Sequence, residues 1–209
     1  MKKKTKLTLL LLSITVMMLA FGGSAHAAGK KAKALKAYDK FLSEKEKTPG
    51  SLFDTWGLAY LNNDSVPELL TYNSGFPATG KPCMYTYKKN KVVLVSLNAS
   101  SCYYSHYYKK KGVVVSIYVP VAGHKDTSGF KGYYTCNFKK AFSSRNQNLI
   151  IICEKEGSKY CKPNKDHSEM VDISKSAFNK LIKAKVGQAK AKKVKYYKNT
   201  AKNRKKHLK

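Results

Sequence analysis

Side chains that could bind a hard cation stand together between residues 60 and 69. Four positions could each supply an oxygen ligand: Asn62, Asp64, Val66 through its carbonyl, and Glu68. Calcium loops bring carboxylates and a backbone carbonyl together around a turn in this way. Tyr60 stands where such loops begin with an aspartate, however, and two carboxylates are few for an ion that takes roughly six to eight oxygen ligands. The pattern predicts at most a weak calcium site and no other cofactor, and we favour a turn in which Asn62 and Asp64 cap backbone amides.

Thiols are a second group of reactive side chains in the chain. The five cysteines are Cys83, Cys102, Cys136, Cys153 and Cys161. In an exported protein cysteines can pair, although an odd number leaves one over. If the third hairpin is in register, Cys136 faces Cys153; a turn near Gly157 would instead place Cys153 opposite Cys161, and Cys83 with Cys102 is a further candidate pair. The alternative is that they are small buried apolar side chains, and no C-x-x-C spacing indicates zinc.

A catalytic base with its orienting group could lie in the loop that contains His124 and Asp126. One His–Asp proximity without a nucleophile motif is a weak signal, and no local signature marks a catalytic cysteine. Paired carboxylates of the glycosidase kind are poorly supported in a chain with only 12 acidic residues. We therefore predict no catalytic residue. A secreted hydrolase acting on wall or host polymers, with His124, His106 or a cysteine in its site, is the alternative.

Positive charge is the strongest signal outside the fold pattern. The chain has 41 Lys and Arg against 12 Asp and Glu, a net charge of +29, and residues 183–209 contain no acidic residue. The polyanion-binding candidates in this segment are Lys190, Lys192, Lys193, Lys195, Lys198, Lys202, Arg204, Lys205 and Lys206. Such a run is typically solvated and attracts polyanions by counterion release. Because only Arg145 and Arg204 are arginines, specific nucleic-acid recognition is not expected.

The first 27 residues have the three parts of a signal peptide. A lysine-rich start precedes an apolar run of 15 residues, Leu7 to Phe21, and Ala25-His26-Ala27 supplies the small residues of a cleavage site. The run is shorter than the roughly 20 apolar residues of a membrane-spanning helix. We expect a secreted product with no transmembrane span, a charge of +25 after loss of four lysines, and retention at an anionic cell-wall polymer or acidic glycan.

The elements that must position these residues begin with a helix at residues 30–47, where Leu35, Tyr38, Phe41 and Leu42 recur at helical spacing. Strand patterns follow at 53–61, 66–72, 83–88, 91–97, 103–108, 113–119, 133–138 and 149–154. The first strands of successive hairpins are rich in tyrosine and the second strands are aliphatic, which suggests a loose repeat of a hairpin unit. Neighbouring hairpins pair most easily with each other, so an antiparallel meander is expected.

A second helix is predicted at residues 174–186, with Ser174 as its N-cap and Gly187 at its end. Residues 193–197 could add a short strand, and residues 200–208 could form either a helical turn or a disordered end.

We therefore predict an α+β fold in which a single domain spans 28–186, an antiparallel hairpin meander lies between two helices, and residues 187–209 form a basic tail. A propeller fragment or a two-sheet sandwich would use the same strands.

Part of this sequence resembles exported, largely uncharacterised proteins of Gram-positive anaerobes. In them a helix with a Tyr-x-x-Phe-Leu stretch precedes a strand and an Asp-x-Asp-x-x-Pro-Glu-Leu turn. Tyr38-Asp39-Lys40-Phe41-Leu42 and residues 62–69 correspond to these motifs here, with asparagine at the first acidic place, and residues 197–206 resemble the lysine-rich ending. The resemblance implies export and no particular activity. The leading expectation is a non-catalytic secreted protein, held by its lysines, whose tyrosine-rich strands could contact a glycan or a protein.

Overall fold

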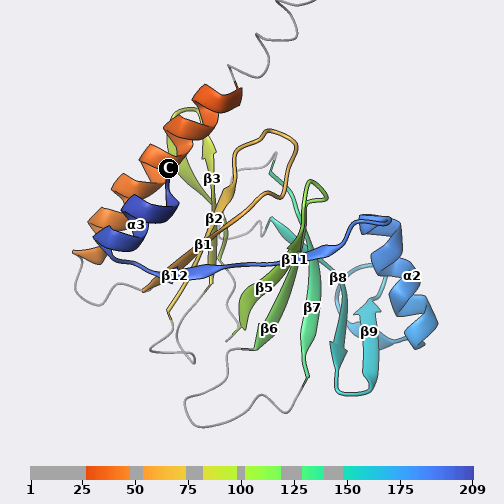
Figure 1. Cartoon of the computed structure of the whole chain (residues 1–209). Helices are drawn as coiled ribbons and strands as arrows, with labels where there is room; N and C mark the ends of the chain where they lie inside the picture. Colours follow the sequence, from red (N-terminus) through yellow and green to blue (C-terminus); the bar gives the residue numbers. More distant parts are fainter. Residues whose placement is uncertain (1–26, 48–53, 74–81, 98–101, 119–128, 139–147) are drawn as a thin grey trace, which may run out of the picture.

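The computed structural model describes residues 27–47, 54–73, 82–97, 102–118, 129–138 and 148–209 (Figure 1). The expected signal peptide, except for Ala27, lies outside these residues, as does the loop with His124 and Asp126. Within them the chain has an α+β fold of antiparallel hairpins, with one helix before the strands and further helices near the C-terminus. The predicted fold class is confirmed.

The described strands form two antiparallel sheets. The first sheet has the order β12-β1-β2-β3-β4 and the second the order β10-β9-β8-β7-β6-β5-β11. The strands are β1 Thr55–Ala59, β2 Glu68–Tyr72, β3 Cys83–Lys88, β4 Lys91–Leu97, β5 Cys102–Tyr108, β6 Val113–Tyr118, β7 Lys131–Cys136, β8 Leu149–Glu156, β9 Lys159–Pro163, β10 Met170–Asp172, β11 Ala191–Lys193 and β12 Tyr196–Lys198. The helices are the N-terminal helix at 27–46, α2 Lys175–Val186 and α3 Ala201–His207.

The two sheets pack against each other and bury the central core between them. Ala59, Leu70 and Met84 of the first sheet share one hydrophobic cluster with Tyr104 and Val114 of the second. The N-terminal helix covers the other face of the first sheet, and α2 packs on the other face of the second (Figure 1). The order of layers is therefore helix, sheet, sheet, helix, which permits both sheets to bury two faces.

The N-terminal helix docks through the apolar positions that its spacing predicts. Leu35, Tyr38 and Leu42 are buried in a cluster with Trp56 of β1, because residues three and four apart share one helix face. The Tyr38 hydroxyl also donates to the Pro67 carbonyl oxygen at 2.9 Å. Its polar tip is thus satisfied inside the core, and it joins the helix to the turn before β2.

Helix α2 begins and ends where its sequence predicts. The Ser174 hydroxyl accepts from the Ala177 amide at 3.1 Å, and Gly187 follows the last turn with a φ of +62°. Phe178 and Val186 are its buried residues and pack with Cys153 of β8. None of the described helices is long and apolar enough to cross a membrane.

Three successive hairpins, β3–β4, β5–β6 and β7–β8, share one irregularity. In each of them the pairing register shifts by one residue, and the residue without a partner is Val95 of β4, Ser105 of β5 or Ile152 of β8. Such bulges increase the local twist and let side chains change face. The extra residue Ser105 lets Tyr104 and Tyr107 of β5 both face the core between the sheets, where Tyr104 is fully buried. The tyrosine-rich strands therefore do not form one exposed aromatic surface.

The segment expected as a basic tail is part of the folded body. Residues 191–198, which we call the strap, leave the second sheet as β11 and enter the first sheet as β12 (Figure 1). Between the two strands, Val194 is 3% exposed and its amide donates to the Ser105 carbonyl oxygen at 2.9 Å. The strap crosses β1 at Gly57, where an added Cβ would lie 2.8 Å from the Lys195 carbonyl oxygen. Only glycine gives the strap this close approach.

Helix α3 follows the strap and packs beside the N-terminal helix. The Thr200 hydroxyl caps it by accepting from the Asn203 amide at 3.3 Å, and Leu208 joins the cluster under the N-terminal helix. Asn199 is 9% exposed and donates through Nδ2 to the Leu42 carbonyl oxygen at 2.9 Å. Of the two outcomes left open for 200–208, a helix is the one observed.

Candidate functional site

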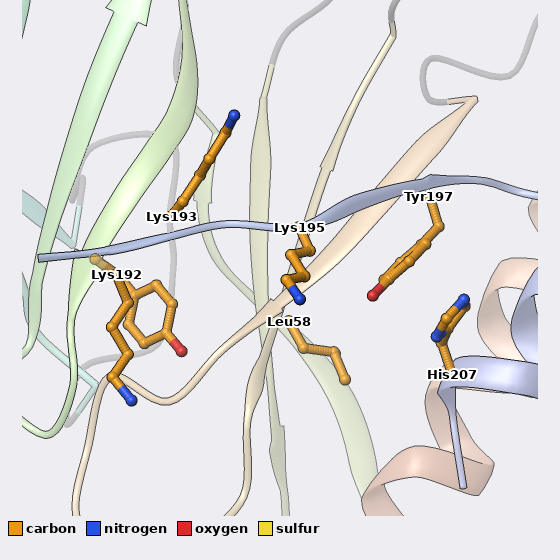
Figure 2. A pocket seen from close by; sticks show the side chains of 7 residues that line it. Leu58, Lys192, Lys193, Lys195, Tyr197 and His207 are labelled. Carbon is orange, nitrogen blue, oxygen red and sulfur yellow. The ribbon is translucent and has the colours of Figure 1, made fainter.

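A cavity in the described part of the chain lies along the strap. It measures about 520 Å³ and is lined by Leu58, Tyr107, Lys192, Lys193, Lys195, Tyr197 and His207. Figure 2 shows Lys192 and Lys195 extending to the same side of the strap, with Tyr197 between Lys195 and His207. Lys193 extends to the opposite side of the strap (Figure 2). We call this cavity the strap cleft.

Separate elements hold the lining of the strap cleft in place. Lys192 of β11 pairs with Tyr107 of β5, which sets one wall. Tyr197 of β12 pairs with Trp56 of β1, and its ring stacks on His207 of α3 with centroids 3.8 Å apart and planes 16° apart. The cleft therefore exists only when the strap and α3 are both docked.

The chemistry of the strap cleft is that of an anion-binding surface. Lys192 and Lys195 extend into the cleft beside two tyrosine rings, and no carboxylate is among its described lining residues, so the positive potential is not cancelled there. Lys192 and Lys195 are exposed, which leaves their ammonium groups solvated and able to meet an anion. Lysine and tyrosine supply hydrogen-bond donors and aromatic faces, but neither a metal-ligand set nor an activated nucleophile lies in the lining.

Eight of the nine predicted polyanion-binding residues are exposed, and one is not. The exposed residues are Lys190, Lys192, Lys193, Lys195, Lys198, Lys202, Lys205 and Lys206. Arg204 is 5% exposed and its guanidinium donates to Asp39 Oδ1 at 3.1 Å, Glu46 Oε2 at 2.7 Å and Asn199 Oδ1 at 2.9 Å. These partners use its charge inside the fold, so we remove Arg204 from the candidate surface.

The candidate calcium loop uses its oxygens for hydrogen bonds within the turn. Asn62 Oδ1 accepts from the Asp64 amide and Asp64 Oδ1 from the Val66 amide, both at 3.0 Å, as the favoured Asx-turn interpretation requires. Glu68 is fully buried, and its carboxyl accepts from the Leu61 amide at 2.9 Å and from Asn62 Nδ2 at 2.8 Å. Burial raises the pKa of Glu68 to about 8. No group of three metal-ligating side chains occurs among the described residues.

The third hairpin does not bring two cysteines together. Cys136 lies opposite Leu149, and Cys153 lies opposite Tyr133. The expectation that Cys136 faces Cys153 is wrong because the hairpin loop closes directly after Cys136, where the Asn137 amide donates to the Asn148 carbonyl oxygen at 2.7 Å. The register after the bulge therefore pairs Cys136 with the first residue of β8.

The other two expected pairings are also not formed. Cys161 lies opposite Glu154, one residue beyond Cys153, and its thiol donates to the Glu154 carbonyl oxygen at 3.7 Å. Cys83 and Cys102 begin strands of different sheets, and both are buried. No disulfide joins any of the five cysteines, all of which the structure describes. Three of the thiols are buried, as expected for small apolar side chains on strands.

A second cavity of about 330 Å³ lies over β5, β6 and β7 and contains His106. The ring Nδ1 of His106 lies 3.1 Å from Ser105 Oγ, and the Ser105 hydroxyl donates to the Val115 carbonyl oxygen at 3.3 Å. The single proton of Ser105 therefore has two acceptors within reach, the Val115 carbonyl oxygen and the His106 ring nitrogen in the tautomer that leaves Nδ1 unprotonated. Burial lowers the pKa of His106, and Lys131 and Lys193 lower it further. No acidic side chain that could orient His106 is among the described residues that line this cavity.

Sequence reasoning found the lysines of the strap cleft but not its aromatic residues. The sequence places Tyr107 and Leu58 in strands and Tyr197 at the end of a possible short strand in the basic tail. His207 falls in the segment 200–208, for which the sequence leaves both a helical turn and disorder open. Residues 192–197 have the sequence Lys-Lys-Val-Lys-Tyr-Tyr, and the closeness of three lysines to two tyrosines is the available signal. No protein-family model matches the chain, and comparison with curated proteins and with solved structures gives no significant match.

Proposed function

We propose that this protein is a secreted, non-catalytic binding protein that is retained at the cell surface by an anionic wall polymer or acidic glycan. The observation that carries the proposal is the strap cleft, where lysines and aromatic rings converge and the lining residues that the structure describes include no carboxylate. The signal-peptide pattern, the net charge of +29 and the resemblance to exported proteins support secretion and attraction to polyanions.

Folding of the basic segment strengthens this proposal. A disordered tail would present its lysines in no fixed arrangement and would bind by charge density alone. Pairing of β11 with β5 and of β12 with β1 instead fixes Lys192 and Lys195 beside Tyr107 and Tyr197. Less side-chain and backbone entropy is then lost when a ligand binds.

The alternative function, a secreted hydrolase, lacks a supporting geometry in the described residues. No acidic side chain is among the described residues that line the cavity with Ser105 and His106, so no third group completes a catalytic triad there. Burial raises the pKa of Cys153 to about 12, which opposes the reactive thiolate. His124 and Asp126 lie outside the described residues. The direct test of this alternative is to measure hydrolysis of wall polymers by the unmodified chain and by His124→Ala.

The test of the proposal is sedimentation of the chain from residue 28 onward with isolated Gram-positive wall material. We expect binding at low salt that weakens as the Debye length falls from about 10 Å at 0.1 M to about 3 Å at 1 M salt. The double variant Lys192→Gln/Lys195→Gln should bind about tenfold more weakly, with a salt dependence reduced by roughly two counterions. No binding at low salt would refute the proposal.

A matched control separates the strap cleft from overall charge. Lys205→Gln/Lys206→Gln removes two charges from exposed positions of α3 that do not line the cleft. We expect it to weaken binding less than about threefold. Equal losses in the two double variants would show that charge density alone holds the protein. Secretion is tested separately by mass spectrometry of the medium, where the N-terminus should be Ala28.

A further inference from the structure

A second group of lysines and aromatic side chains lies next to the strap cleft. The ammonium groups of Lys31, on the N-terminal helix, and of Lys109, in the β5–β6 turn, each lie 5.9 Å from the centroid of the Tyr60 ring. The neighbouring Lys30 forms an ion pair with Asp64 at 3.1 Å. The carboxylate of Asp64 is therefore bound by Lys30 and not by Lys31 or Lys109. We call Tyr60, Lys31 and Lys109 the Tyr60 group.

Backbone hydrogen bonds hold the Tyr60 group against the second sheet. The Lys110 amide donates to the Tyr60 carbonyl oxygen at 2.9 Å, and the Gly112 amide donates to the Leu61 carbonyl oxygen at 2.7 Å. These bonds tie the loop after β1 to the β5–β6 turn. The turn that carries Lys109 is therefore fixed relative to the Tyr60 ring rather than placed by side-chain contacts alone.

Tyr107 connects the Tyr60 group to the strap cleft. Tyr60 packs on the same hydrophobic cluster as Tyr107. The Tyr60 side chain and backbone both affect the pKa of the Tyr107 hydroxyl, which burial raises, so the two residues are neighbours. Tyr107 in turn lines the strap cleft beside Lys192, its partner in the β5–β11 ladder. Aromatic rings and lysines thus continue from His207 through Tyr107 to Lys109.

We propose that the strap cleft and the Tyr60 group are two subsites of one binding track for a linear acidic polysaccharide. This inference rests on the proposed function and narrows its ligand. Lysines at both ends of the track would bind carboxylate groups on successive sugars, and the half-buried ring of Tyr60 would pack against the apolar C–H face of a sugar ring. Tyr107 is 8% exposed and connects the two subsites from the core side. A single sugar unit would fill only one subsite, so affinity must increase with chain length.

The composition of the track favours an acidic polysaccharide over the other polyanions. Nucleic-acid surfaces rely on arginine for phosphate and base contacts, and the one arginine of the described residues, Arg204, is buried in ion pairs. A polyol phosphate chain has charge but no ring to pack on tyrosine. Only a charged chain of rings uses both components of the track.

Chain length and position-specific variants test the track. We would measure binding of a galacturonate disaccharide and of a galacturonate chain of about eight units, and expect the longer chain to bind at least tenfold more tightly. Lys31→Gln/Lys109→Gln should weaken binding of the long chain about tenfold and leave disaccharide binding at the strap cleft unchanged. Equal affinity for both lengths in the unmodified protein would overturn the track.

The control variant is Lys180→Gln/Lys183→Gln, which removes two exposed charges from α2 on the far side of the second sheet. It should weaken binding less than about threefold. If it weakens long-chain binding as much as Lys31→Gln/Lys109→Gln does, the Tyr60 group is not a subsite. That result would leave the proposed function, retention at wall material, unaffected. Failure to bind wall material at all would instead refute the proposed function.

Removal of the ring tests the aromatic part of the track. Tyr60→Phe keeps the ring and should bind the long chain as the unmodified protein does, while Tyr60→Leu should bind it about tenfold more weakly. Thermal unfolding of both variants shows whether the fold is retained. If polyglycerol phosphate of matched charge binds as tightly as the galacturonate chain, and Tyr60→Leu affects neither, the assignment to sugar rings is wrong.

Discussion

Arg204 donates to Glu46 across the two ends of the fold, with its Nη1 2.7 Å from Glu46 Oε2. The two residues are 158 positions apart in the chain. The same guanidinium donates to Asp39 at 3.1 Å, so one arginine joins α3 to two positions of the N-terminal helix. Because α3 follows the strap directly, this ion pair also holds one end of the strap cleft.

Replacement of Arg204 with Gln should therefore destabilise the fold and weaken the strap cleft together. Removal of one partner of a buried ion pair costs about 3–5 kcal/mol. The side chains of Asp39 and Glu46 are 55% and 38% exposed, so water can solvate both carboxylates once the arginine is gone. We therefore expect the free energy of unfolding to fall by about 2 kcal/mol. Urea denaturation measures this loss. The neighbouring surface variant Lys205→Gln should change stability by less than about 0.5 kcal/mol, and an equal loss there would contradict the assignment.

Gly57→Ala should displace the strap from β1. The added Cβ would lie 2.8 Å from both the Lys195 carbonyl oxygen and Val194 Cγ1, and the backbone oxygen cannot turn away as a flexible side chain can. We expect a stability loss of about 1–3 kcal/mol by denaturant titration, with weaker binding at the strap cleft.

Gly29→Ala is the matched control for this substitution, because nothing lies within 4 Å of a Cβ built there and Gly29 is an exposed helical residue. Its stability should be unchanged or raised by up to about 1 kcal/mol. Unaltered stability and binding in Gly57→Ala would show that the strap accommodates a methyl group and that the crossing is not tight.

Glu68 should make stability decrease from acidic to mildly alkaline pH. Burial raises its pKa from 4.5 to about 8 in the folded chain, so the folded state binds more protons than the unfolded state between these values. Its contribution is complete below about pH 4.5 and is lost as pH rises through about 8, by at most about 1.4 kcal/mol per pH unit.

The Glu68→Gln variant tests this pH dependence, because its side chain stays neutral throughout. The loss of stability between pH 5 and pH 8, measured by urea titration, should be smaller in the variant than in the unmodified chain. The Leu61 amide and Asn62 Nδ2 each donate to one oxygen of the Glu68 carboxyl. Gln has only one side-chain oxygen, so its NH₂ group would face one of these donors and a hydrogen bond would be lost. The variant should therefore be less stable than the unmodified chain at pH 5. Parallel pH profiles would contradict the shift.

Cys161 should react first among the thiols of the native chain. Cys161 and Cys136 are half-buried, whereas Cys83, Cys102 and Cys153 are buried. Burial raises the pKa of Cys136 well above its ordinary value, which leaves Cys161 as the more reactive of these two thiols. Burial raises the pKa of Cys161, and nearby acidic groups, Glu154 first, raise it further, so its alkylation should be slow at neutral pH and accelerate as pH rises. Mass spectrometry after iodoacetamide treatment identifies the labelled site. Cys161→Ser should lose the first labelling phase, and early labelling of Cys153 would contradict the packing of β8 against α2.

The local pattern of the sequence was enough to predict most elements of this fold. The helix over 174–186, with its Ser174 cap and terminal Gly187, and the strands at 83–88 and 91–97 follow from capping and alternation, which depend on near neighbours. The Asx turns of Asn62 and Asp64 follow for the same reason. The lysines of the candidate surface were predicted by composition alone, because charge and exposure go together.

Long-range contacts decided the rest. Nothing near Val194 or Gly57 in sequence indicates that the chain crosses from one sheet to the other there, since that crossing depends on β1 and β5 being already in place. Burial of Arg204 depends on Asp39 and Glu46, more than 150 residues away. The strap cleft likewise draws Tyr107 and His207 from separate elements. Sequence by itself determined which residues carry charge, and only the tertiary structure decided which of those charges are used inside the fold and which face a ligand.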